Sequence, residues 1–455
     1  MLKRLALLAA LFCLALSAHA QSIEDEALAW LQDFIRVDTI NPPGNETRAV
    51  EFIANILEAE GIPYQTAESA PGRGNLWARL EGGDEPALIL LQHTDVVPAD
   101  PAYWTVDPLS GEIKDGYVWG RGTLDMKGTG ISQLATFVSL HRAGVALNRD
   151  VVLIATADEE AGGMYGAGWL TENHPEIFEG AGLLINEGGS GEDNDKGRVF
   201  SVEVTQKVPV WLRLTAVDTP GHGSMPNATS SVTRIVDALS IVKSNPSPPR
   251  IVPAVDAMFQ SLSESAGPEW ADAYANMPAA VKEPGFLSKL QEHSTFLHAL
   301  TRDTCSITRF EASNKINVVP PEAWAEIDCR ILPDRPSDIF VNEMRELIKD
   351  TGVEISVIMA FTPAVSSTNS RLYRAIESVT GERHPGSKVM PSVASGFTDS
   401  HFTRDLGIAS YGFDPIVVPE AEGVRIHGND ERVSVSAFKR GVSDHLAIIQ
   451  SVVYE

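Results

Sequence analysis

Cysteine is scarce in this chain of 455 residues, which contains only Cys13, Cys305 and Cys329. None of them lies near a signature of a catalytic or zinc-binding cysteine, so a thiolate metal site is not indicated. Cys305 and Cys329 lie in two strand-like runs, "TCSITRF" and "AEIDCRIL", whose composition favours a hairpin. Because strand register cannot be read from the sequence, we expect two buried free thiols, with a disulfide as the alternative.

Positively charged residues are also few relative to acidic ones. The chain has 36 Lys and Arg residues against 61 Asp and Glu residues, which gives a formal net charge of −25 at pH 7. This excess argues against nucleic acid and anionic membranes as partners. A soluble, self-repelling surface explains most of it, with cation binding as the alternative role for part of the acidic residues.

Long apolar runs are absent after the first twenty residues, "MLKRLALLAALFCLALSAHA". This segment has Lys3 and Arg4, then an apolar run, then Ala18-His19-Ala20, which predicts a signal peptide over residues 1–20. The short apolar run favours cleavage after Ala20 over an uncleaved anchor. We therefore expect an exported protein, periplasmic or secreted, with no stable membrane anchor.

Helical and strand patterns alternate along the first part of the chain. Amphipathic helices are predicted at 22–37 and 47–61, and strands at 75–82, 87–97, 151–160 and 182–189. A further helix is predicted at 130–144. Alternation of this kind predicts an α/β fold with a mixed sheet covered by helices.

The pattern changes near residue 203. The run "VEVTQKVPVWLRLTAV" predicts strands with one solvated face, and helices, the two cysteine-bearing strands, a helix at 337–350 and a strand at 352–360 follow. This order predicts an α+β domain inserted over residues 203–361. The α/β domain is then split into two parts, 21–202 and 362–455.

Histidines and carboxylates follow the ends of several predicted strands. The set comprises His93, Asp95, Asp125, Glu159, Glu160, Glu187 and His427. Strand ends at one edge of an α/β sheet are the usual place for a binding site. Nitrogen and oxygen ligands without thiolate suit Zn²⁺, with Co²⁺ or Mn²⁺ as alternatives. A metal centre would also offset the cost of burying so many acidic groups.

Two pairs within this set suggest a division of roles. His93 and Asp95 lie two apart on a strand, as expected for a metal ligand and the carboxylate that orients it, although a core histidine bonded to a local acid is the alternative. Glu159 and Glu160 follow a buried strand, where one can bind metal while the other takes a proton from the attacking water. Asp125 alone is typical of a helix N-cap.

Eight motifs occur in order over nearly the whole chain. They are "HTDVVP", "WGRGTLDMKG", "TADEEAGG", "NEGG", "TPGHGSMP", "NVVPPEAWAEIDCRILP", "GFTDS" and "RIHGNDERV". In these motifs the chain resembles the M20 family of dinuclear metallo-exopeptidases and aminoacylases, above all its aminoacylase-1 and carboxypeptidase S branch. The resemblance implies a zinc exopeptidase-like catalytic domain, an inserted lid and dimerisation domain, two divalent metal ions per subunit and a homodimer.

The resemblance also implies a ligand set. His93 and Glu187 would bind one ion, Glu160 and His427 would bind the other, and Asp125 would bridge the two. In the family the peptide bond after this aspartate is often cis.

The remaining implied roles are catalytic and substrate-binding. Glu159 would act as general base and then as acid, Asp95 would orient His93, and His222 would reach across the dimer to stabilise the oxyanion. From the residues alone, His222 between Gly221 and Gly223 is more typical of a turn than of a functional site.

Substrate recognition is implied at four positions, Asn317, Arg330, Gly396 and Thr398. Arg330 suits a terminal carboxylate because its guanidinium binds one bidentately, with a surface ion pair to Asp328 or Asp334 as the alternative. Phe397 departs from the Gly-Gly-Thr-Asp turn of the family, which puts the substrate implied by the family in question.

Together these observations predict an exported amidohydrolase that cleaves the amide bond next to an amino acid with a free carboxylate. A carboxypeptidase or dipeptidase acting on small peptides is the first expectation, and a hydrolase or synthase of N-acyl amino acids is the alternative. A non-catalytic binding module is the alternative from another class, disfavoured by the complete ligand set and by Glu159.

Overall fold

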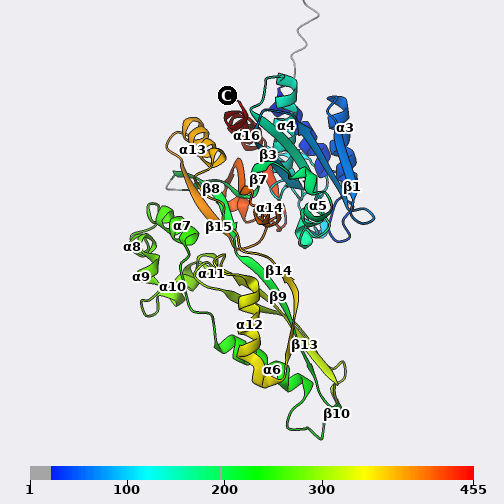
Figure 1. Ribbon diagram of the computed structural model, residues 1–455, viewed down its shortest axis with the longest axis vertical. Coiled ribbons are helices and arrows are strands. Elements are labelled where there is room, and N and C mark those ends of the chain that lie inside the picture. The colour runs from blue at the N-terminus through cyan, green and yellow to red at the C-terminus, as the bar shows by residue number, and fades with distance from the viewer. Residues whose placement is uncertain (1–21, 195–196, 455) are drawn as a thin grey trace, which may run out of the picture.

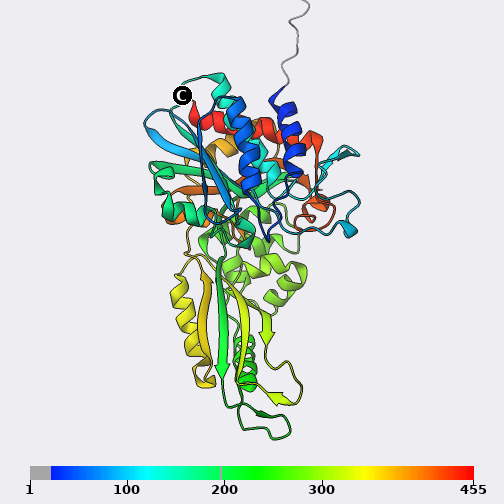
Figure 2. The same ribbon diagram turned by 90° about the vertical axis from the view of Figure 1, so that its right-hand side faces the viewer.

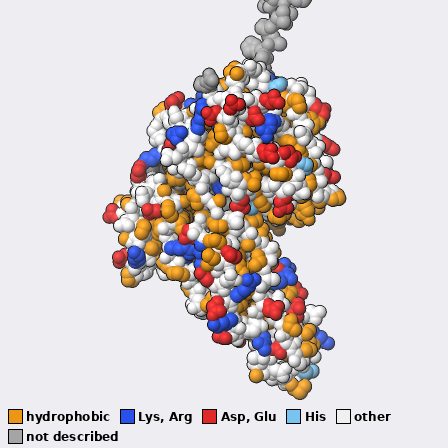
Figure 3. Space-filling model, viewed as in Figure 1, with side chains coloured by type: hydrophobic (Ala, Val, Ile, Leu, Met, Phe, Trp, Pro, Cys, Tyr) orange, Lys and Arg blue, Asp and Glu red, His pale blue; other side chains and the backbone are white. Residues whose placement is uncertain are grey.

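The computed structural model describes residues 22–194 and 197–454 (Figure 1). The predicted signal peptide, residues 1–20, lies outside the described residues. Within these two ranges, no helix combines the length and apolarity that a bilayer span requires. On the face that Figure 3 shows, acidic and basic side chains lie interspersed, so no patch of one sign dominates that face.

An eight-stranded mixed sheet forms the larger body of the molecule. Its strand order is β1-β2-β6-β3-β7-β16-β8-β15. The strands are β1 (Tyr64–Glu68), β2 (Gly74–Leu80), β3 (Glu85–His93), β6 (Arg149–Thr156), β7 (Ala181–Asn194), β8 (Gly197–Gln206), β15 (Lys388–Ala394) and β16 (Ala409–Pro419). Neighbours β6, β3, β7 and β16 are parallel, while β1, β2 and β6 pair antiparallel. The predicted mixed α/β sheet is confirmed.

Helices cover both faces of this sheet. The helices of the larger layer are α2 (Ile23–Ile35), α3 (Thr47–Ala59), α4 (Lys127–Ala143), α13 (Arg371–Arg383) and α16 (Val435–Val453). The opposite face lies under α5 (Ala167–Asn173) and α14 (Ser400–Asp405). Alternate residues of β3 enter two separate cores, with Leu88 and Leu90 in one and Ile89 and Leu91 in the other. This double burial explains the uninterrupted apolar run that predicted the strand.

A second, four-stranded antiparallel sheet extends away from the first (Figure 2). Its order is β11-β13-β9-β14, with β9 (Val208–Val217), β11 (Thr304–Glu311), β13 (Glu322–Ile331) and β14 (Glu354–Ala360). Helices α6 (Ser231–Ser244) and α12 (Ser337–Ile348) pack against it around one apolar core. At its far end, β10 (Gly221–His222) pairs with β12 (Val318–Val319).

A helical layer lies beside the junction of the two sheets. It comprises α7 (Pro253–Ser263), α8 (Ala271–Ala275), α9 (Met277–Ala280), α10 (Phe286–His293) and α11 (Thr295–Ala299). Its own core includes Val393 of β15 and Leu332 just after β13, so it contacts both bodies. The remaining elements are β4 (Ile113–Lys114), β5 (Tyr117–Trp119), β17 (Arg432–Ser434), α15 (Glu420–Gly423) and the 3₁₀ turns Pro101–Tyr103, Glu159–Ala161, Pro175–Ile177 and Lys349–Thr351.

The chain passes from the large sheet to the small one at Lys207, between β8 and β9. The sequence pattern starts the inserted domain at residue 203, so it includes the last four residues of β8, 203–206. These residues belong instead to the large sheet, because β8 pairs with β15 there. Lys207 is buried, and its ammonium donates to the carbonyl oxygens of Ala299 (2.7 Å) and Arg302 (2.8 Å). Alternation marks a strand but not the sheet to which the strand belongs.

Cys305 and Cys329 form a disulfide. The expectation of two free thiols is therefore wrong. Antiparallel pairing of β11 with β13 sets the two residues directly opposite each other, with their Cα atoms 4.0 Å apart. A bulge between Ile307 and Arg309 shifts this register, which is why the sequence does not reveal it.

Removing the disulfide is expected to destabilise the fold. It closes a loop across 24 positions, and loops of this size contribute about 3 kcal/mol through the entropy of the unfolded chain. The double variant Cys305→Ala/Cys329→Ala should unfold at correspondingly lower urea concentration than the wild type. Adding a reductant should bring the wild type to the stability of the variant. Equal stability of the oxidised wild type and the variant would contradict this assignment.

Candidate active site

Asp95 joins the loops that follow β3 and β6. Its backbone oxygen lies 3.0 Å from Nδ1 of His93, and its Oδ1 lies 3.3 Å from the same nitrogen. Its carboxylate also accepts the backbone N–H groups of Glu159 and Glu160, both at 3.1 Å, and the amide of Asn41 at 2.8 Å. Asp95 thereby fixes the orientation of His93 and the position of both glutamates.

Glu431 holds the turn that presents Asp125. Its Oε1 accepts the backbone N–H groups of Gly122 (3.1 Å), Leu124 (2.8 Å) and Asp125 (3.3 Å), and its other oxygen pairs with Arg121. The peptide bond that follows Asp125 is cis. The sequence analysis did not identify Glu431. The signal that could have done so is its position in the motif "RIHGNDERV", which also contains His427.

Asp125 stands between the two histidines. Its Oδ1 lies 3.2 Å from Nε2 of His93, and its Oδ2 lies 3.0 Å from Nε2 of His427. Glu187 Oε2 lies 3.5 Å from His93 Nε2, and Glu160 Oε2 lies 3.3 Å from His427 Nε2. The five residues therefore form two groups that share one carboxylate, which is the arrangement that a pair of bridged cations requires.

Glu159 faces the same cluster without contacting a histidine closely. Its Oε2 lies 4.0 Å from His93 Nε2, and the residue is 6% exposed. Ligand atoms of His93, Glu159 and Glu187 all lie within 4.8 Å of one another, as do those of His93, Asp125 and Glu160. By distance, the carboxylate of Glu159 could therefore bind a metal ion together with His93 and Glu187.

Asp158, the first acidic residue of the "TADEE" motif, has a partner outside the cluster. Asp158 forms an ion pair with Arg73, which also pairs with Glu46 at 2.5 Å. Asp158 adopts a left-handed backbone conformation with φ 70° and so starts the turn that carries Glu159 and Glu160. This buried pair fixes the loop rather than contributing to the cluster.

The cluster carries more negative charge than its own histidines neutralise. Burial raises the pKa of Glu187 to about 8, and burial together with Glu187 raises the pKa of Glu159 well above its ordinary value. Burial alone would lower the pKa of His93, but Glu187, Asp125 and Asp95 raise it well above the usual range. Oε1 of Glu160 is buried without a hydrogen-bond partner among the described residues. This donor set of imidazole nitrogen and carboxylate oxygen fits divalent cations.

Arg330 and the turn that precedes α14 lie together near the junction of the two sheets. Arg330 pairs with Asp328 at 2.7 Å, and its guanidinium lies over the rings of Phe397 (5.6 Å) and Trp211 (5.8 Å). The backbone N–H of Thr398 donates to Gln206 at 3.0 Å, while Gly396 is exposed. Nη1 of Arg330 is buried without a hydrogen-bond partner within the described part of the chain.

His222 and Asn317 lie at the far tip of the small sheet, remote from the cluster of their own chain (Figure 1). Both are exposed, and the N–H of Gly223 donates to the carbonyl oxygen of Asn317 at 2.9 Å. The structure thus brings these two predicted residues together, but not to the other site residues of the same subunit.

Two apolar cavities lie beside the predicted site residues. One of about 700 Å³ is lined by Trp211, Met359, Phe361 and Phe402, and so shares Trp211 with the surroundings of Arg330. A smaller one of about 280 Å³ reaches Asp125 and Glu187 themselves, with apolar walls that include Ile416, Val418 and Ile426. Both offer room for apolar parts of a substrate.

Comparison with known proteins identifies the family. Residues 89–451 match the model of Peptidase family M20/M25/M40. The chain belongs to this family. It is 33% identical to N-fatty-acyl-amino acid synthase/hydrolase PM20D1 of Xenopus tropicalis, over 82% of this chain and 74% of that protein. It is 30% identical to Probable carboxypeptidase S-like 2 of Dictyostelium discoideum, over 82% and 73%.

A solved structure shares the fold. The M20 family metallo-carboxypeptidase Sso-CP2 from Sulfolobus solfataricus superposes with a TM-score of 0.72 at 19% identity, covering 94% of this chain and 99% of that one. The resemblance seen in the motifs is confirmed, and M20 membership makes this chain a hydrolase of C–N bonds.

Proposed function

We propose that this chain is a two-metal amidohydrolase that releases an amino acid with a free α-carboxylate. The observation that carries the proposal is the position of Asp125, with one oxygen facing His93 and the other facing His427. Zn²⁺ is the proposed metal, with Co²⁺ or Mn²⁺ as alternatives, because the donor set contains no thiolate.

The assignment of ligands follows the distances. His93, Asp125 and Glu187 would hold one ion, and Asp125, Glu160 and His427 would hold the other. Divalent ions at such positions polarise a carbonyl group and acidify water.

Glu159 is the proposed proton carrier. Its carboxylate takes a proton from the attacking water and then delivers that proton to the leaving amine. Burial and the neighbouring carboxylate of Glu187 raise its pKa, which brings its proton affinity closer to that of the groups with which it exchanges protons.

Arg330 is proposed to bind the α-carboxylate of the substrate, beside the turn of Gly396 and Thr398. Its unpartnered Nη1 and its position over the ring of Phe397 favour a planar, charge-assisted contact. His222 and Asn317 are proposed to complete the site of the partner subunit in a homodimer, because their position at the tip separates them from their own cluster. We retain export by the predicted signal peptide as part of the proposal.

N-acyl amino acids are the first candidate substrates. Two apolar cavities adjoin the site residues, and a relative at 33% identity is named for N-fatty-acyl amino acids. Small peptides are the second candidate, favoured by the likeness to a carboxypeptidase S-like protein. The same site catalyses net synthesis when the free carboxylic acid and the amino acid are abundant, since a catalyst accelerates both hydrolysis and condensation.

Amino-acid release from a matched substrate panel tests this function. Dipeptides, N-acetyl amino acids and long-chain N-acyl amino acids would share each C-terminal residue, with and without a chelator. We expect release to be abolished by the chelator, restored by Zn²⁺, and fastest for long acyl chains. Preference for dipeptides would reverse the order of the two candidates. No release from any substrate by the metal-loaded protein would favour a binding module instead.

Arg330→Met is expected to raise KM roughly 100-fold for substrates with a free carboxylate, because a charge-assisted contact contributes about 1.5–3 kcal/mol. Substrates with a carboxamide in place of this carboxylate should have a high KM with the wild type and the same KM with the variant. Arg213→Gln is a matched control, since Arg213 lies on the same sheet and pairs with Glu326. A variant that still discriminates against the carboxamide would contradict this role.

A further inference from the structure

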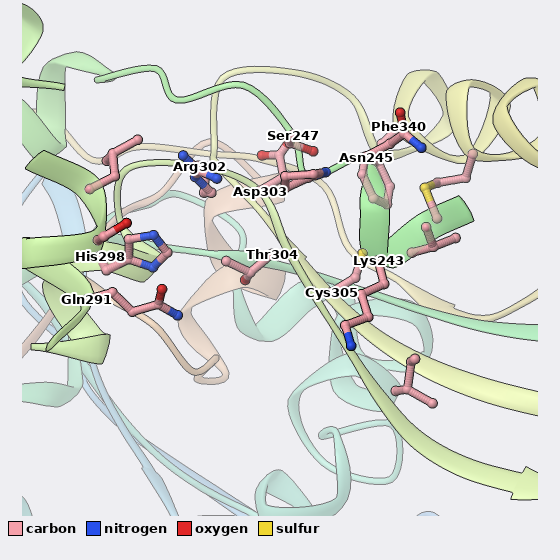
Figure 4. A pocket seen from close by; sticks show the side chains of 16 residues that line it. Lys243, Asn245, Ser247, Gln291, His298, Arg302, Asp303, Thr304, Cys305 and Phe340 are labelled. Carbon is pink, nitrogen blue, oxygen red and sulfur yellow. The ribbon is translucent and has the colours of Figure 1, made fainter. Parts of the chain in front are cut away.

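A third cavity, of about 620 Å³, lies in the part of the chain between residues 242 and 344. It is bounded by the end of α6, by α10 and α11, by the start of β11 and by α12 (Figure 4). Val242, Leu287, Phe340 and Met344 provide apolar walls. None of its lining residues belongs to the metal cluster or to the proposed substrate contacts, so it is a separate site.

Lys243 and Arg302 both line this cavity, on different sides of it (Figure 4). Within residues 22–194 and 197–454, neither side chain forms an ion pair or a hydrogen bond. Nε of Arg302 is buried without a partner. Lys243 is exposed, whereas Arg302 is half-buried. Most half-buried cations in proteins have hydrogen-bond partners, so the unpaired guanidinium of Arg302 is unusual.

The acidic residue of the lining does not neutralise them. Asp303 is buried, and its carboxylate accepts hydrogen bonds from Arg250 and Arg335 and from the backbone N–H of Leu332. The cavity therefore has an excess of positive charge, in a chain whose net charge is −25.

One group in the lining is affected by the charge of Arg302. Burial lowers the pKa of His298, and Arg302 and Lys207 lower it further. Arg302 therefore disfavours an additional positive charge on His298.

We propose that this cavity binds an amphipathic carboxylate. Its headgroup contacts Arg302, and its apolar body packs against Leu287, Phe340 and Met344. Lys243 contributes a second positive charge at the opposite, exposed side of the cavity. The volume lies within the usual range of small-molecule sites, which combine apolar walls with a few polar anchors. The proposal does not depend on the reaction at the metal cluster.

Isothermal titration of the metal-loaded mature protein with decanoate tests the proposal, with decanol as the uncharged analogue. The wild type should bind decanoate and bind decanol far more weakly. Lys243→Gln/Arg302→Gln should raise the Kd for decanoate by tenfold or more, because the variant loses the charge-assisted contact with Arg302 and the positive charge of Lys243. Turnover of an N-acetyl amino acid should be unchanged in this variant, which separates the cavity from the catalytic site.

Two further variants keep the result decisive. Lys282→Gln/Arg440→Gln removes the same charge from exposed positions outside the cavity and should leave decanoate binding intact. Ser288→Trp fills the cavity and should abolish binding without changing the charge. Decanoate affinity that survives in the Lys243→Gln/Arg302→Gln variant, or equal affinity for decanol, would overturn the proposal.

Discussion

Glu159→Gln is expected to lower kcat by about 10³-fold, within the usual range for loss of a general base. The amide is nearly isosteric with the carboxylate, so the loop that Asp95 and Asp158 fix should keep its shape. Because an amide cannot take up a proton from water, the loss should fall on kcat while KM changes little. Steady-state rates with the best substrate of the panel provide the measurement.

Metal content decides whether Glu159 is a base or a ligand. Its Oε2 lies close enough to His93 and Glu187 to bind an ion with them, so a fall in activity alone does not separate the two roles. We expect the Glu159→Gln variant to retain two metal ions per subunit by elemental analysis. Glu172→Gln, at an exposed position, is the matched control. Loss of one ion in the Glu159→Gln variant would assign Glu159 to the metal centre instead.

The pH profile gives an independent readout of the same residue. A general base must be deprotonated to act, so kcat/KM should fall as the pH decreases through the pKa of Glu159. Burial and Glu187 raise that pKa, while bound cations lower it. The acid limb assigned to Glu159 should therefore be absent from the residual activity of the Glu159→Gln variant.

The cluster was predictable because its residues follow the ends of adjacent strands. β3, β6 and β7 are parallel neighbours, so His93, Glu160 and Glu187 emerge at one edge of the sheet without any long-range information. The buried strands themselves were visible as apolar runs. Asp125 and His427 needed the family motifs, because each alone is typical of a turn or loop.

Other features depend on contacts between distant segments. The disulfide follows from the register between β11 and β13, and the assignment of β8 follows from its partner β15. The third cavity is lined by both Lys243 and Arg302, which are 59 positions apart in sequence. A periodic pattern describes one element at a time, so it contains no signal for any of these.

His222→Ala is expected to lower kcat by about 10²- to 10³-fold, as expected for the loss of one oxyanion contact. The tip that carries His222 and Asn317 lies far from the cluster of its own subunit (Figure 1). If a homodimer brings the two together, each active site combines the metal cluster of one subunit with His222 of the partner subunit. A site shared in this way predicts that two variants with complementary defects restore activity in a mixed dimer.

Mixed dimers of two inactive variants should recover activity. In a dimer of Glu159→Gln with His222→Ala, one site combines an intact cluster with His222 of the partner subunit, and the other site lacks both groups. Random co-assembly makes half of the dimers mixed, so about a quarter of the wild-type activity should return. Glu159→Gln co-expressed with Asp125→Asn is the matched control and should recover nothing, because both changes lie in the same cluster. Absence of recovery in the first mixture, with dimers verified by differential tags, would place His222 outside the catalytic site and remove the argument for a shared one.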